Sequence, residues 1–91
     1  MNVKEQEKRY AEYLKEEIEK INAALSEEIQ QIGEYADENL EISRGADYDA
    51  MVDQAITNSR NEIRWLYSGA LERQLSQKYI EDVFGEYEFL F

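Results

Sequence analysis

The fold of this chain is decided by residues 10–40, which read YAEYLKEEIEKINAALSEEIQQIGEYADENL. Apolar residues recur in this stretch at steps of four, four and three: Tyr10, Leu14, Ile18, Ile21, Leu25, Ile29, Ile32, Ala36 and Leu40. The spacing is an 11-residue repeat of about 3.67 residues per turn, close to the pitch of a straight α-helix. The residues between the apolar positions include many Glu, Lys and Gln, which favour a helix. We therefore predict one long helix with a single apolar stripe, in which Ile18, Ile21, Leu25 and Ile29 are mostly buried.

This first helix is predicted to cover residues 3–43. The chain contains no proline, so nothing forces a break. Gly33 is the weakest position, because glycine costs about 1 kcal/mol relative to alanine inside a helix. The stripe continues in phase beyond it, so we expect the helix to pass Gly33, with or without a kink. Gly45 is a natural left-handed residue for the end of the helix.

In the second half of the chain we predict one helix or more over residues 48–84. Asp47 or Asp49 is a plausible N-cap. Ser59–Glu62 reads SRNE, the pattern of a capping box, and Gly69 is a second weak position, so a break at either place is open. The apolar residues of this half recur at helical spacing: Met51, Val52, Ala55, Ile56, Ile63, Leu66, Tyr67, Ala70, Leu71, Leu75 and Tyr79. We predict a stop at Gly85 and an extended tail over residues 85–91.

These elements predict a single all-α domain over residues 1–91, built on a long antiparallel helical hairpin. Arms of about 40 residues would be about 60 Å long. A lone hairpin of that length leaves one side of each apolar stripe in water. The chain must therefore fold back into a small helical bundle or be completed by homodimerisation, and both alternatives are open. Trp65 and the other aromatic residues are expected in the core or in such a dimer interface.

The composition excludes several classes of function. The chain has 21 acidic residues against 10 basic ones, a net charge of −11, which is unsuited to binding phosphates or an anionic membrane directly. It contains no Cys and no His, which excludes Cys-His and Ser-His-Asp nucleophiles and His-containing zinc sites. We therefore expect a protein that is not an enzyme, has no cofactor and contacts neither nucleic acid nor membrane. The N-terminal MNVKEQEKRY lacks the apolar segment of a signal peptide, so we expect a cytoplasmic location.

The negative charge is concentrated around the predicted turn. Residues 27–53 hold nine acids and one base, Arg44, whereas residues 1–20 hold six acids and five bases. Spacings of seven, four and three place four of the acids in one row on a helix, with neighbours about 5–6 Å apart. The remaining acids are expected to broaden the row. The predicted partner-binding residues are Glu27, Glu34, Asp37, Glu38, Glu41, Asp47, Asp49 and Asp53.

These acids allow two other interpretations, a solvated face and a metal site. A run of charge is commonly a solvated face with no further role. The segment DYDAMVD, residues 47–53, opens like a calcium-binding EF-hand loop, but Met51 stands where an oxygen ligand belongs and the glycine of that loop is missing. Paired carboxylates such as Glu27 and Glu28 are also found in helical NTP pyrophosphatases, yet a second spaced set is not convincing here. We therefore predict no metal site.

The length, the acidity and the lack of a catalytic constellation resemble those of small acidic inhibitors carried by phages and mobile elements. Those include anti-restriction, anti-CRISPR and uracil-DNA glycosylase inhibitor proteins, several of which mimic DNA. The resemblance covers charge and length only, and no motif matches. It implies an inhibitor that occupies the basic nucleic-acid groove of a partner protein, with a secondary apolar contact through Tyr87, Phe89 and Phe91. The main alternative is a homodimeric structural or regulatory adaptor that acts through apolar contacts, and a weaker one is a carboxylate-metal hydrolase.

Overall fold

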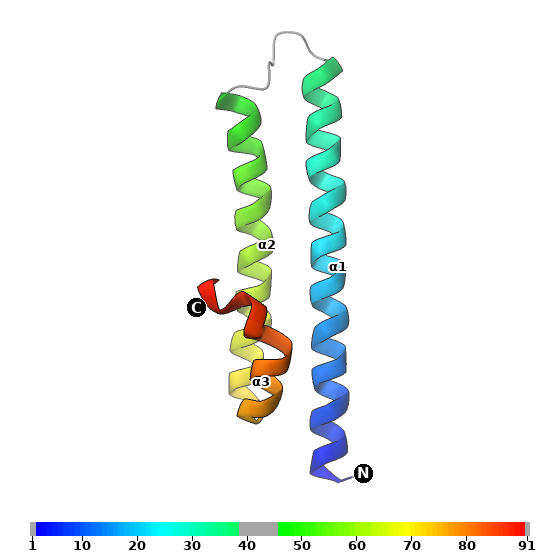
Figure 1. Ribbon diagram of the computed structural model, residues 1–91, viewed down its shortest axis with the longest axis vertical. Helices are drawn as coiled ribbons and strands as arrows, with labels where there is room; N and C mark the ends of the chain where they lie inside the picture. Colours follow the sequence, from blue (N-terminus) through cyan, green and yellow to red (C-terminus); the bar gives the residue numbers. More distant parts are fainter. Residues whose placement is uncertain (1, 39–45, 91) are drawn as a thin grey trace.

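The computed structural model describes residues 2–38 and 46–90, and the regular secondary structure of these residues is helical only. The elements are α1 (Val3–Glu38), α2 (Ala46–Glu72), α3 (Gln77–Phe84) and a 3₁₀ segment, η1 (Gly85–Leu90). Figure 1 shows α1 and α2 side by side and antiparallel, with α3 folded back onto the end where α1 begins and α2 ends. The molecule measures 58 × 22 × 17 Å. The predicted all-α helical hairpin is confirmed, and a third helix completes a small bundle at one end.

Helix α1 forms as its periodicity predicts. Asn2 caps its start, because the Asn2 Oδ1 atom accepts a hydrogen bond of 2.9 Å from the Glu5 backbone N–H. The helix continues through Gly33 without interruption, and Gly33 is buried. The last predicted residues of this helix, with Leu40 and Gly45, lie outside the described residues.

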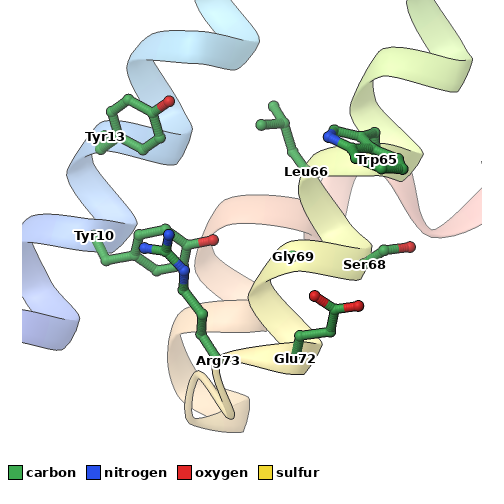
Figure 2. Close-up of a pocket in the computed structure, with 8 residues that line it drawn as sticks. All are labelled: Tyr10, Tyr13, Trp65, Leu66, Ser68, Gly69, Glu72 and Arg73. Atoms are coloured by element: carbon green, nitrogen blue, oxygen red, sulfur yellow. The ribbon is translucent and has the colours of Figure 1, made fainter.

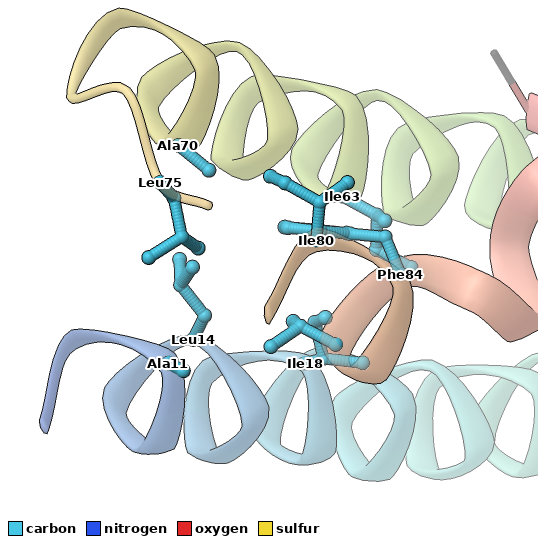
Figure 3. Packing of buried hydrophobic residues seen from close by; sticks show 9 residues of the cluster. Ala11, Leu14, Ile18, Ile63, Ala70, Leu75, Ile80 and Phe84 are labelled. Carbon is cyan, nitrogen blue, oxygen red and sulfur yellow. The ribbon is translucent and has the colours of Figure 1, made fainter. Parts of the chain in front are cut away.

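The hydrophobic core lies at the three-helix end of the hairpin (Figure 3). Each of the three helices and the turn before α3 contributes to it. Phe84 and Leu14 are its largest fully buried side chains, and Tyr67 meets the Phe84 ring edge-on with the ring centroids 5.3 Å apart. The buried members of the cluster are Ala11, Leu14, Ile18, Ile63, Ala70, Leu75, Ile80, Val83 and Phe84.

The other half of the hairpin is only two helices thick. Small or modest side chains are buried there between α1 and α2: Ile32, Ala36, Ala55 and Ser59. Of the four stripe residues predicted to be mostly buried, Ile18 is fully buried, Ile21, Leu25 and Ile29 are partly buried, and none is exposed. Ile21 still packs against the core cluster, and Leu25 and Ile29 lie beyond it. Two helices in contact shield only one side of each other, and among the described residues α3 packs at the other end of the hairpin.

Helix α2 ends at a Schellman motif that the sequence analysis did not predict. It runs through both Ser59 and Gly69, where a break was left open, and ends at Glu72. The Leu75 N–H donates to the Ala70 carbonyl and the Gln74 N–H to the Leu71 carbonyl, both at 3.0 Å. Gln74 has φ 57°, the left-handed conformation that this motif usually gives to glycine.

Replacing Gln74 with glycine is therefore expected to stabilise the protein. A left-handed conformation costs a residue with a side chain about 1–2 kcal/mol, and glycine avoids most of this cost. We expect Gln74→Gly to raise the free energy of unfolding by about 1 kcal/mol in urea titrations. Gln30→Gly, at an exposed position inside α1, is the matched control and should lower it by about the same amount. A loss of stability in Gln74→Gly would contradict the motif.

Two further predictions of local structure are corrected. Residues 85–90 form η1 rather than an extended tail, because Tyr87 turns back onto the core and the Gly85 N–H bonds to the Glu81 carbonyl. The predicted stop of α3 before Gly85 is confirmed. Asp47 and Asp49 lie within the first turn of α2, which begins at Ala46, and so neither is the N-cap. Their charges there are still favourable, because the start of a helix carries partial positive charge.

Candidate partner-binding surfaces

The acids predicted to bind a partner lie on both arms of the two-helix half. Glu27 and Glu34 are exposed on α1 and are separated by about two turns, on the side opposite the buried stripe. Gln31 Nε2 donates to Glu27 Oε1 at 3.5 Å, and Gln30 Nε2 donates to Glu34 Oε1 at 3.3 Å. These donors are neutral, so the hydrogen bonds orient the carboxylates without cancelling their charge.

The acids on α2 do not belong to this row. Asp47, Asp49 and Asp53 are exposed on α2. Asp49 and Asp53 are about one turn apart on one flank of α2, whereas Asp47 is rotated by about 200° from Asp49 and lies on the other flank. Asp37 and Glu38 lie in the last turn of α1, and Glu41 lies outside the described residues. By helical spacing Glu38 continues the row of Glu27 and Glu34, and the acids of α2 add charge on the second arm. We call the eight predicted partner-binding acids together the acidic surface.

The density of charge on each arm is close to that of one DNA strand. From Glu27 to Glu38, α1 carries five acids and no base over about 17 Å, or about one charge per 3.4 Å. From Asp47 to Asp53, α2 carries three acids over about 9 Å. A DNA strand carries one negative charge per about 3.4 Å of helix axis, and the strands of a duplex, like α1 and α2, are antiparallel.

The lysines that form ion pairs lie in the other half of the molecule. Lys15 Nζ is 2.6 Å from Asp82 Oδ2, which ties α3 to α1, and Lys20 Nζ is 3.3 Å from Glu17 Oε1. Between Ile21 and Ser59 the sequence has one base, Arg44. The two ends of the hairpin thus differ in charge as well as in thickness.

Of the three aromatic residues predicted to make a secondary apolar contact with a partner, Tyr87 packs within the fold. Tyr87 is half-buried against the core, and its hydroxyl oxygen accepts a hydrogen bond of 2.9 Å from Asn22 Nδ2. This contact joins η1 to α1, so Tyr87 contributes to the fold. Phe89 lies within η1, and Phe91 lies outside the described residues.

A second surface, which the sequence analysis did not identify, lies between α1 and α2 on the face away from α3. We call it the seam groove. It consists of two adjoining cavities of about 300 and 450 Å³ that share Trp65 and Leu66. Figure 2 shows the first cavity, with Tyr10 and Tyr13 on α1 facing Leu66 on α2 and the Arg73 guanidinium over the Tyr10 ring, 4.7 Å from its centroid.

Trp65 does not belong to the core, one of its two predicted places, whereas a place in a dimer interface stays a prediction. Its side chain is 80% exposed, and Tyr13 is 51% exposed on the opposite wall of the groove. The signal was present in the sequence, because Trp65 is two residues from Ile63 and so about 200° away around the helix. Helical spacing alone would have placed it outside the apolar stripe of α2.

Within residues 2–38 and 46–90 the structure contains neither a metal-ligating group of side chains nor a membrane-spanning helix. No group of three acidic side chains there is arranged to hold a metal ion. In the same ranges, no helix combines the length and the apolar character needed to cross a membrane. The chain matches no protein-family model, and no curated protein or solved structure is significantly similar to it.

Proposed function

We propose that this protein is a non-enzymatic inhibitor that presents its acidic surface to the basic nucleic-acid groove of a partner protein. The proposal rests on the density of uncompensated carboxylates on the two antiparallel arms. This density is close to one charge per about 3.4 Å, as along the axis of one DNA strand. Carboxylates at such spacing repel one another and weaken the helix. A role in binding explains why the chain carries closely spaced carboxylates that lower the stability of its helices.

The shape of the molecule suits this role. The acidic half is a rod two helices wide, and α3 with its core packs at the other end (Figure 1). A basic groove could therefore close around both arms without meeting the bulkier end. Together with its size and acidity, this supports an inhibitor of the anti-CRISPR or anti-restriction type, which would meet its nucleic-acid-binding partner in the cytoplasm.

The proposal is tested by competition with DNA. Proteins from a cell extract that bind DNA-cellulose are passed over the immobilised chain, and the retained proteins are eluted with duplex DNA or with a salt gradient. We expect proteins that are released by DNA and by moderate salt, because the attraction is electrostatic and is screened over about 8–10 Å. Proteins that stay bound in excess DNA would contradict a mimic of nucleic acid.

Charge reversal localises the contact. Glu27→Lys with Glu34→Lys is expected to lose nearly all of this retention, because each reversal replaces an attraction by a repulsion inside the groove. Glu12→Lys with Glu16→Lys is the matched control, because these acids are also exposed on α1 and the variant has the same net charge. The control should keep most of the retention. Equal behaviour of the two variants would show that only net charge matters, and the acidic surface would not be the site.

A further inference from the structure

The seam groove is an apolar feature of the surface that the proposed function does not use. α3 packs on the opposite side of the hairpin, where Lys15, Asp82 and Val83 line a separate hollow. The groove extends along α1 from Tyr10 to Ile21, about 16 Å, which is the length of about three helical turns. It therefore has the dimensions to receive one helix of another protein.

The larger cavity of the groove combines an apolar floor with an acidic rim. Ile21 and Leu66 are half-buried and form the floor. Glu17 on α1 and Glu62 on α2 line the same cavity, and Trp65 stands beside them with 80% of its surface exposed. An exposed indole ring next to two carboxylates is suited to a cation with a flat, apolar face, which is the chemistry of an arginine side chain.

We propose that the seam groove binds a basic amphipathic helix of a partner protein, with an arginine over Trp65 between Glu17 and Glu62. Leucine-like side chains of that helix would lie on Ile21 and Leu66, and its flanking bases would meet the acidic rim. The proposal rests on the proposed function in one respect, that the partner is a basic protein. It adds a second contact, at the three-helix end, that no nucleic acid would make.

A second copy of this chain suits the groove less well. Pairing two grooves would place four carboxylates in one interface, Glu17 and Glu62 from each copy, and each chain carries a net charge of −11. The bases at the groove are already engaged, since Lys20 pairs with Glu17 and Arg73 lies over Tyr10. The Lys20 side chain is 73% exposed, so an incoming arginine can replace it at low cost.

The fluorescence of Trp65 tests the proposal, because it is the only tryptophan of the chain. The probe is a tryptophan-free helical peptide with a leucine stripe flanked by arginines, and its control has glutamates in place of the arginines. We expect the arginine peptide to shift the Trp65 emission to shorter wavelength and to protect it from acrylamide, and the glutamate peptide to do neither. A lysine version should bind more weakly, because a guanidinium stacks on indole better than an ammonium does.

Two variants with equal net charge separate this site from the acidic surface. Glu17→Gln with Glu62→Gln should weaken binding of the arginine peptide by about tenfold, and Glu27→Gln with Glu34→Gln by less than about twofold. Calorimetry measures binding independently of Trp65. Binding that is lost only in the Glu27 and Glu34 variant, without a change in Trp65 emission, would overturn the groove as the site and leave the proposed function standing. A Trp65 shift on raising the protein concentration alone, with a dimer in sedimentation, would assign the groove to a second copy and overturn the proposal.

Discussion

A chain that ends at Ser76, and so lacks α3, is expected to be unfolded or without a cooperative unfolding transition at room temperature. Ile80, Val83 and Phe84 are all buried in α3, and burying each side chain contributes about 1.5–3 kcal/mol, or about 5–9 kcal/mol together. A domain of this length is stable by only about 5–14 kcal/mol. Their partners in the hairpin, such as Leu14 and Ile63, would also become exposed.

Circular dichroism during a urea titration checks this result, and a second truncation provides the control. A chain that ends at Tyr87 keeps α3 and the hydrogen bond from Asn22, so it should unfold cooperatively with most of the stability of the full chain. A sharp transition in the chain that ends at Ser76 would show that the two-helix hairpin is stable alone. The core described here would then not be the main source of stability.

Phe84→Ala is expected to be the most damaging of the single core substitutions considered, with a loss of about 3–5 kcal/mol in the free energy of unfolding. Phe84 is 2% exposed, and its ring lies edge-on to Tyr67 at a centroid distance of 5.3 Å. Removing the ring leaves a cavity among α1, α2 and α3 that the backbone can fill only in part. Urea titration of the variant measures the loss.

Leu25→Ala is the comparison that tests where the core lies. The apolar stripe alone predicts a loss of about 2–5 kcal/mol at Leu25 or Ile29 if these residues are core. Because both are only half-buried in the two-helix half, we expect a loss of about 1–2 kcal/mol at Leu25, clearly less than at Phe84. A larger loss at Leu25 than at Phe84 would mean that the two-helix half is covered in solution, as in the predicted homodimer.

Much of the candidate site could be anticipated from the sequence, and part of it could not. The concentration of acids in residues 27–53 is a property of composition, and the alignment of Glu27 with Glu34 follows from the helical period. The placement of Asp47 away from Asp49 follows from the same period once the start of α2 is known. The seam groove was missed because its walls come from Tyr13 and Trp65, which are 52 positions apart in the sequence and meet only when the hairpin closes.

The sequence by itself determined that α1 is one long helix, that a second helical arm follows, and that the charge lies toward the turn. These properties depend on spacings of three and four residues, and the backbone bonds of a helix act over the same range. The tertiary structure decided that α2 ends at Glu72, with the left-handed turn at Gln74 rather than at a glycine, because the burial of Leu75 against the core holds that turn. It also decided which half of the stripe is covered. Which half of the stripe is covered depends on where α3 packs. That packing joins residues far apart in the chain, so no local periodic pattern in the sequence predicts it.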